Sequence, residues 1–149
     1  MTNKIEKDRR QYRRYRVSNR LFAIVRSDMH LFDRFESMSK GEIAMAIIKS
    51  KPTHMGEIVE ISRGGLSFQY IDTDRILSQP CELDILFIDE DFHLSGLPFQ
   101  AVEDRSIKSD APFDVLRMKR LTVKFCGLTS KQKLKLDHLL KNYTSGKIH

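Results

Sequence analysis

The sequence concentrates its surplus positive charge in arginines near its start. Arg10 and Arg14 are separated by three residues, and Arg9 and Arg13 repeat this spacing. Residues 1–20 hold eight Lys and Arg against two Asp and Glu, whereas the rest of the chain holds 18 of each and is neutral. A guanidinium group is a planar fork of donors that pairs with a phosphate or with the O6 and N7 edge of guanine, and it also stacks on a base. The segment therefore predicts an arm that binds an anion through the planar faces and edges of its guanidinium groups, and it is expected to be mobile when no ligand is present.

A second group of candidate residues lies about fifty positions later, in a run that predicts a strand over residues 57–62. Because side chains alternate along a strand, Val59 and Ile61 are expected on the core face, and Glu60 and Ser62 on the other face. A carboxylate accepts hydrogen bonds from guanine N1–H and from its exocyclic amine, and a serine hydroxyl adds a further contact. This strand therefore offers acceptors for a guanine base.

Two glycines, Gly64 and Gly65, follow this strand directly. Glycine permits a tight turn with positive φ and lets a ligand approach the backbone closely. Taken together, the arginines and this acceptor pair suit a purine that carries phosphates. Taken alone, such a turn is also a common hairpin element, and an arginine-rich terminus is also a common solvated tail.

The rest of the chain alternates short apolar runs with polar or turn residues, as is typical of an all-β domain. In the run that starts at Leu66, the apolar residues Leu66, Phe68 and Tyr70 fall on one face. Many short strands at this spacing favour a small barrel or sandwich. The expected strands are residues 21–26, 43–49, 57–62, 66–71, 82–88, 121–125 and, more weakly, 92–102.

Two segments instead have helical spacing. A short amphipathic helix is expected within residues 28–41, from Leu31, Phe32, Phe35 and Met38. A C-terminal helix is expected over residues 130–144, from Leu136, Leu139, Leu140 and Tyr143. Thr129 and Gln132 form the capping box that opens this second helix.

Composition places limits on the class of protein. The chain has 149 residues, enough for one domain, and its longest apolar run, residues 43–48, is too short to cross a membrane. No apolar signal region opens the sequence, which predicts a cytoplasmic location. Cys81 and Cys126 are expected to be reduced and buried, since neither has a nearby cysteine partner. The five histidines are scattered, so no metal site is expected.

The two motifs together resemble a known family. Arg10-x-x-x-Arg14 before a first strand, followed by Glu60-x-Ser62-x-x-Gly65, resembles the PilZ domain pattern RxxxR and [D/N]xSxxG. The resemblance covers most of residues 9–143, with 28–50 as an insertion. It implies a small, mainly all-β domain, a six-stranded antiparallel barrel with a C-terminal α-helix. It divides the chain into a basic arm, 1–20, and a single barrel domain, 21–149.

The resemblance also implies a ligand, the bacterial second messenger cyclic di-GMP. Arg10 and Arg14 would hold phosphates and guanine edges, Glu60 and Ser62 would hold a guanine, and Gly65 would keep the turn open. Four further residues would assist without being specified by the motif: Arg9, Arg13, Arg63 and Gly64. The protein would then be a receptor without catalytic residues or cofactors, and its arm would order over the nucleotide and signal to a protein partner.

Position 60 departs from the family pattern, because it is Glu where the pattern has Asp or Asn. The extra methylene moves the carboxylate outward by roughly 1.5 Å. The longer side chain either bends back and still accepts from guanine, or the site is degenerate. From the sequence we expect binding to be retained and Glu60→Asp to bind equally well or more tightly.

Two other functions remain open at this point. A degenerate domain would act only as a protein-interaction adaptor, through its sheet edges and C-terminal helix. A nucleic-acid-binding protein would use the basic arm, but the neutral body disfavours it, and such binding should weaken steeply with salt.

Overall fold

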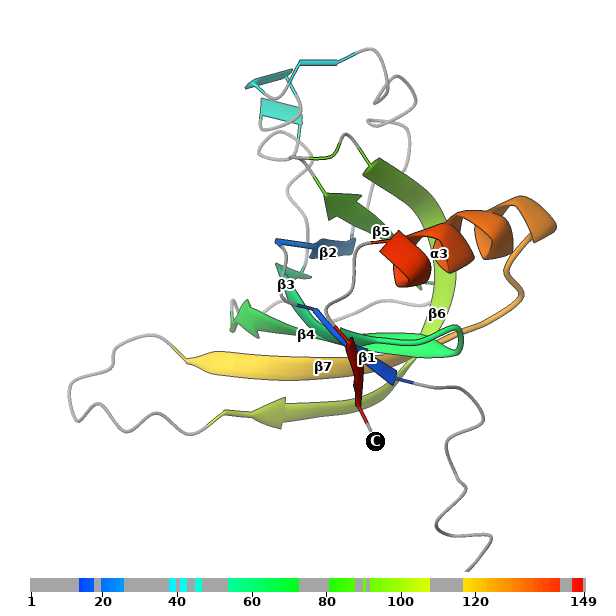
Figure 1. Cartoon of the computed structure of the whole chain (residues 1–149). Helices are drawn as coiled ribbons and strands as arrows, with labels where there is room; N and C mark the ends of the chain where they lie inside the picture. The colour runs from blue at the N-terminus through cyan, green and yellow to red at the C-terminus, as the bar shows by residue number, and fades with distance from the viewer. Residues whose placement is uncertain are drawn as a thin grey trace, which may run out of the picture.

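A computed structural model describes residues 14–17, 20–25, 38–39, 41–42, 45–46, 54–72, 81–87, 90, 92–107, 117–142 and 146–148. Strands dominate this part of the chain, and a C-terminal helix follows them (Figure 1). The strands are β1 (Arg14–Arg16), β2 (Phe22–Val25), β3 (His54–Ile61), β4 (Gly65–Ile71), β5 (Cys81–Phe87), β6 (Phe92–Ser106), β7 (Met118–Phe125) and β8 (Gly146–Ile148). The helix is α3 (Ser130–Asn142).

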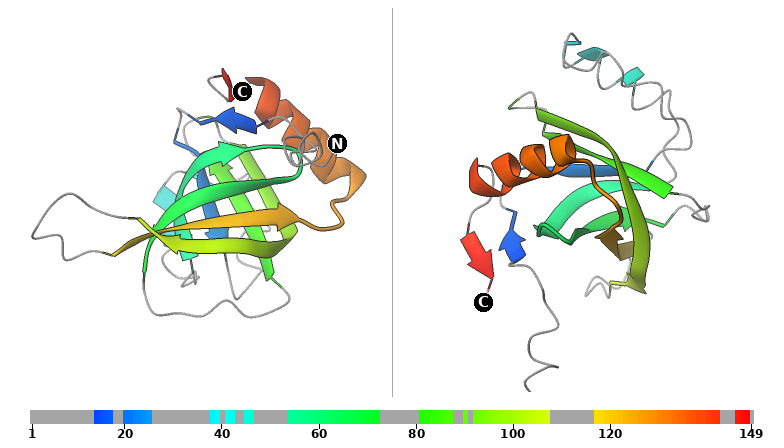
Figure 2. Two further views of the ribbon diagram at one scale, coloured as in Figure 1. Left: turned by 90° about the horizontal axis from the view of Figure 1, so that it is seen from below. Right: turned by 90° about the vertical axis from the view of Figure 1, so that its right-hand side faces the viewer.

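The strands pair antiparallel in the order β2-β5-β6-β7-β4-β3-β1-β8. An additional pairing between β2 and β3 closes β2 to β7 into a six-stranded barrel, as the two further views in Figure 2 show. The first half of β3 pairs with β2, and its second half pairs with β1, so that Arg16 faces Glu60 and Tyr15 faces Ile61. The barrel predicted from the resemblance is therefore confirmed, and β1 lies against the end of β3.

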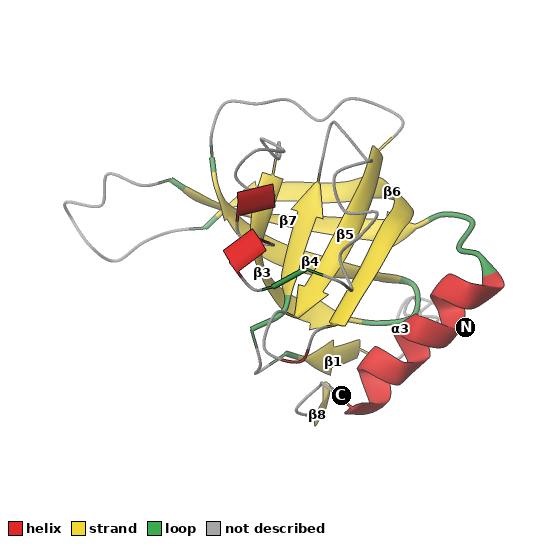
Figure 3. Cartoon of the chain, turned by 90° about the horizontal axis from the view of Figure 1, so that it is seen from above, coloured by secondary structure: helices red, strands yellow, loops and turns green. Residues whose placement is uncertain are grey.

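The barrel interior is filled by the alternating apolar residues of its strands. In β4, Leu66, Phe68 and Tyr70 are buried as predicted, and Phe68 is completely enclosed. Burying a side chain of this size stabilises the fold by about 2–3 kcal/mol. Helix α3 packs across one end of the barrel (Figure 3) through the buried Leu136, Leu139 and Leu140. The predicted Tyr143 contact lies outside the described residues.

The predicted capping box at the start of α3 is confirmed. The amide of Gln132 donates to Thr129 Oγ1 at 3.1 Å, and the amide of Thr129 donates to Gln132 Oε1 at 2.9 Å. These two bonds satisfy amides that a helix start leaves without partners. Gln132 Nε2 also donates to the carbonyl of Gly96, which ties the helix to β6.

Strand β3 is bulged, which makes the predicted placement of Val59 wrong. Ile58 pairs with Phe68 and Glu60 pairs with Ser67, so Val59 is the extra residue of the bulge. Ile58 and Ile61 are the buried pair, whereas Val59 is half-buried. A bulge breaks the two-residue alternation, because two residues of one strand then oppose one residue of its neighbour.

Two further sequence predictions are wrong. Residues 45–46 are helical rather than part of a strand over 43–49, with Ala46 packed against a small cluster that contains Ile24 and Leu86. Cys126 is exposed rather than buried. The helix expected within 28–41 lies almost entirely outside the described residues, and Met38, Ser39 and Gly41 are its described members.

Candidate functional site

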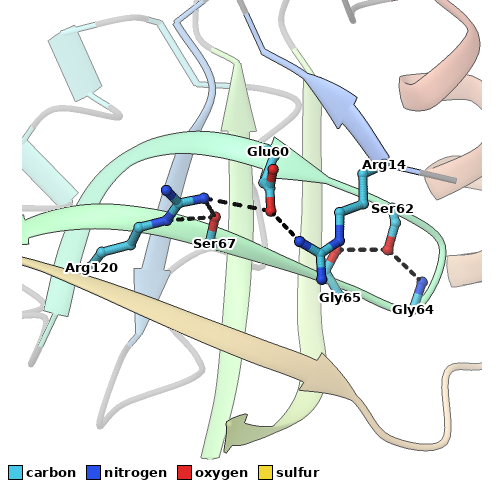
Figure 4. A network of polar contacts seen from close by, with 7 residues as sticks. All are labelled: Arg14, Glu60, Ser62, Gly64, Gly65, Ser67 and Arg120. Carbon is cyan, nitrogen blue, oxygen red and sulfur yellow. Dashed lines mark hydrogen bonds and ion pairs between the residues drawn. The ribbon is translucent and has the colours of Figure 1, made fainter. Parts of the chain in front are cut away.

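The two sequence motifs meet where β1 lies against the end of β3. Arg14 Nη1 donates to Glu60 Oε1 at 2.8 Å, across 46 residues of sequence (Figure 4). The side chain of Arg14 is 36% exposed and that of Glu60 is 18% exposed. The antiparallel register between β1 and β3 brings these two charges together. The pair lies at the surface, so its arginine is accessible to a ligand.

The hydroxyl of Ser62 organises the turn that joins β3 to β4. Its oxygen accepts from the amide of Gly64 at 3.1 Å and donates to the carbonyl of Gly65 at 3.3 Å. The amide of Ser62 also donates to the carbonyl of Gly65, at 2.8 Å. Hydrogen bonds of this kind, from a serine to the backbone two or three residues ahead, stabilise tight turns. Ser62 therefore shapes the turn that borders the site.

Gly65 is required by close strand approach, not by the positive φ that the sequence suggested. The positive φ angles found among the described glycines belong to Gly96 and Gly127. At Gly65, an added Cβ would lie 2.0 Å from the carbonyl oxygen of Val123 on β7. A side chain at this position would push β4 away from β7. The glycine therefore permits the strand pairing beneath the turn.

Arg120 is a site residue that the sequence analysis missed. Its Nε and Nη2 both donate to Ser67 Oγ, at 3.2 and 2.9 Å, and its Nη2 lies 3.5 Å from Glu60 Oε1. Figure 4 shows Glu60 between Arg14 and Arg120. The sequence does carry one signal for Arg120. Leu121 and Val123 are buried, so the alternation along β7 puts Arg120 on the outer face of the barrel. No sequence pattern indicated which acceptor it reaches.

The motif residues line one pocket of about 340 Å³. Its walls include Arg14, Glu60, Ser62, Gly64, Gly65 and Lys124. Val102 also lines it and is 64% exposed, beside a bulge in β6 between Ala101 and Glu103. The pocket thus combines two cations, one carboxylate and an apolar patch. Groups of these kinds can bind the base and the phosphate of one nucleotide at the same time.

The remaining candidate residues lie elsewhere or outside the described chain. Arg63 points away from this pocket and forms a two-pronged ion pair with Asp137 of α3, at 2.9 and 3.2 Å. It lines a neighbouring pocket of about 340 Å³, together with Lys124 and Lys133. Arg9, Arg10 and Arg13 lie outside the described residues.

Neither a metal site nor a membrane span is found in the part of the chain that the structure describes. Its His, Cys, Asp and Glu side chains form no group of three that could hold a metal ion. Its helices are not long and apolar enough to cross a membrane.

The architecture has counterparts among solved structures. The chain is similar to the PilZ domain with c-di-GMP of YcgR from Escherichia coli, with a TM-score of 0.61 and 10% identity, over 91% of this chain and 92% of that one. The fold is that of a PilZ domain. The chain is also similar to MrkH, described as a c-di-GMP-dependent transcription regulatory factor. This match has a TM-score of 0.56 and 12% identity, and it covers 90% of this chain and 50% of that one. No family model and no curated protein matches the sequence.

Proposed function

We propose that this protein is a receptor for cyclic di-GMP and binds it at the pocket formed by the two motifs. One observation carries the proposal. Arg14 from the first motif, and Glu60, Ser62 and Gly65 from the second, line the same pocket on a PilZ fold. The similar structure of the YcgR PilZ domain, which is described with c-di-GMP, supports this choice of ligand.

Each group in the pocket has a role in this proposal. Glu60 accepts from N1–H and the exocyclic amine of one guanine, donors that adenine does not present in this arrangement. Arg14 leaves Glu60 and pairs with a phosphate or with the guanine O6 and N7 edge. Arg10, the other arginine of the motif, joins it from the arm, with Arg9 and Arg13 assisting. Val102 contributes apolar contact to a ring face.

The proposed output is mechanical rather than catalytic. Ligand binding orders the arm over the pocket, and the ordered arm presents a new surface to a protein partner in the cytoplasm. The chemistry of the pocket is that of a binding site, because its charged groups suit recognition of a base and a phosphate.

Isothermal titration calorimetry of the full chain with cyclic di-GMP tests this proposal. We expect saturable binding at low micromolar ligand or tighter, no comparable heat with GMP, and a modest loss of affinity between 50 and 200 mM salt. A nucleic-acid-type phosphate binder would instead lose roughly a thousandfold or more over that range. Absence of heat at high micromolar cyclic di-GMP would contradict the proposal.

A second candidate function is a protein adaptor without a nucleotide ligand. One observation favours it, since Glu60 already contacts both Arg14 and Arg120 and its charge is therefore balanced within the protein. A ligand must displace Arg14 before it can donate hydrogen bonds to the Glu60 carboxylate. If the titration shows no binding, the sheet edges and α3 become the surfaces to test for a protein partner.

A further inference from the structure

Arg120 approaches the pocket from a strand that does not adjoin Glu60. It lies on β7, and β4 separates β7 from β3. Neighbouring strands are about 4.8 Å apart, so Arg120 and Glu60 start from backbones roughly 10 Å apart. Glu60 faces Ser67 directly across the β3–β4 pair, and Arg120 faces Gln69, two residues along β4 from Ser67. Arg120 therefore has to lean diagonally over β4 to reach Ser67 and Glu60.

Arg120 is held more firmly than Arg14. Two of its nitrogens donate to Ser67 Oγ, and Ser67 is 99% buried, with a relative exposure of 1%. The side chain of Arg120 is 20% exposed, against 36% for Arg14. Arg14 pairs with Glu60 from the three-residue strand β1, which lies outside the six-stranded barrel, whereas Arg120 belongs to β7, a strand of the barrel itself. When a ligand competes for the two arginines, Arg14 is the one that can leave.

We propose that Arg120 is a positioning residue that keeps the Glu60 carboxylate aimed at guanine once Arg14 has moved to the ligand. This inference rests on the proposed function of the pocket. Ser67 fixes the guanidinium, and the guanidinium fixes the carboxylate, so the selectivity for guanine depends on a residue outside both motifs.

This arrangement gives a reason for glutamate at position 60. An aspartate carboxylate would end roughly 1.5 Å closer to the β3 backbone. The present 3.5 Å approach of Arg120 Nη2 to Glu60 Oε1 would then exceed ion-pair distance. The sequence alone suggested that Glu60→Asp would bind equally well or more tightly. With Arg120 in view, we instead expect Glu60→Asp to weaken binding, because the shorter side chain loses its fixed partner.

The test compares affinities for cyclic di-GMP and cyclic di-AMP by calorimetry on the full chain. Arg120→Gln is expected to raise the Kd for cyclic di-GMP about tenfold, because the Glu60 carboxylate loses the ion pair that positions it, and to leave the affinity for cyclic di-AMP, which we expect to be lower, unchanged. The preference for guanine therefore falls. Arg120→Lys should recover part of it, since an ammonium group supplies the charge without the planar fork. A purely structural role would reduce affinity for both ligands alike.

Arg105→Gln is the matched control. Arg105 is exposed and faces Arg120 across the β6–β7 pair, so the variant removes the same charge from the same surface. It should leave both affinities unchanged. If Arg120→Gln fails to fold, Ser67→Ala removes the acceptor that fixes the guanidinium and should lower the guanine preference severalfold while keeping the charge.

The outcomes separate this inference from the proposed function. If wild type binds cyclic di-GMP and Arg120→Gln or Ser67→Ala keeps the same preference, Arg120 has no positioning role. Equal or tighter binding by Glu60→Asp would also contradict the inference. If wild type does not bind cyclic di-GMP at all, the proposed function fails and the inference fails with it.

Discussion

Two polar clusters share strands β3, β4 and β7, and one of the two contributes side chains to the pocket. The pocket cluster consists of Arg14, Glu60, Ser67 and Arg120, of which Arg14 and Glu60 line the pocket. The closed cluster consists of His54, Tyr70, Asp104 and Lys119, at the other end of β3. Tyr70 Oη donates to Asp104 Oδ1 at 2.7 Å, and Lys119 Nζ lies 3.2 Å from Asp104 Oδ2. His54 packs edge-on against the Tyr70 ring, with ring centroids 4.6 Å apart.

We expect the closed cluster to contribute to folding stability and the pocket cluster to contribute to ligand binding. In the closed cluster, Tyr70 and His54 are buried, so loss of the Asp104 acceptor would leave the Tyr70 hydroxyl without a partner, whereas Asp104 itself is 35% exposed. In the pocket cluster, the Arg14–Glu60 pair is partly exposed, and such pairs contribute about 0–1 kcal/mol to stability. A partner that adds little to stability is exchanged for a ligand at little cost. We therefore expect variants of the two clusters to affect different measurements.

Gly65→Ala should have the largest effect on stability, because the pocket rests on the close approach of β4 and β7. The added Cβ meets the Val123 carbonyl at 2.0 Å, a backbone atom that cannot move aside alone. We expect the free energy of unfolding to fall by about 3 kcal/mol in urea denaturation. Gly127→Ala is the control, with φ of 69° and no neighbouring atom within 4 Å of its added Cβ, and it should cost about 1 kcal/mol. Equal costs would contradict the crowding argument.

Arg14→Ala should separate binding from stability. Removing a charged contact to the ligand is expected to raise the Kd for cyclic di-GMP by about ten- to a hundredfold. The free energy of unfolding should change by less than about 1 kcal/mol, because Glu60 keeps Arg120 as a partner. Calorimetric titration and urea denaturation of the same variant measure both quantities. An unchanged Kd would place the ligand elsewhere.

Tyr70→Phe is the converse variant in the closed cluster. It removes the hydroxyl that donates to Asp104 and keeps the ring in the core. We expect the free energy of unfolding to fall by about 1 kcal/mol and the Kd for cyclic di-GMP to stay within about twofold. Burial and, after it, the hydrogen bond to Asp104 raise the pKa of the Tyr70 hydroxyl well above its usual value, so the hydroxyl remains a donor at neutral pH. A large change in Kd would show that the two clusters are coupled.

The smallest expected effect is a pH dependence of stability from His54. Burial lowers the pKa of His54 below 6.5, and its Nδ1 is buried without a hydrogen-bond partner in the described structure. The unfolded chain therefore takes up this proton first as the pH falls. The corresponding stability is present above pH 6.5 and is lost as the pH falls toward the lowered pKa.

His54→Phe keeps an aromatic ring beside Tyr70 and removes the titrating group. Denaturation between pH 7.5 and 5.0 should show a steeper loss of stability in wild type than in this variant. Parallel curves would mean that other groups cause the pH dependence.

The sequence predicted the parts of this structure that follow from local pattern. The alternation at Leu66, Phe68 and Tyr70 and the capping box at Thr129 and Gln132 are both present. Arg14 and Glu60, which the resemblance to the PilZ pattern assigned to one ligand site, line the same pocket. Each of these features depends on residues close in sequence or on a recurring pairing of strands.

The missed features depend on contacts between strands. The bulge at Val59 shifts the pairing of β3 and β4 by one residue, and a two-residue alternation does not encode it. Position 65 must be glycine because a carbonyl group on β7 lies too close for a side chain. Arg120, also on β7, donates to Ser67 on β4. Residues 45–46 are helical although their apolar run predicts a strand, because a short apolar run fits both a strand and a buried helix.

The most direct test of the whole account is a backbone-amide NMR titration of the full chain with cyclic di-GMP. The account predicts saturable shifts for amides at the pocket, from Glu60 to Gly65 and around Thr122, with little change at His54, Tyr70 and Lys119. Shifts centred on the closed cluster, or no shifts at saturating ligand, would contradict the assignment of the pocket as the binding site.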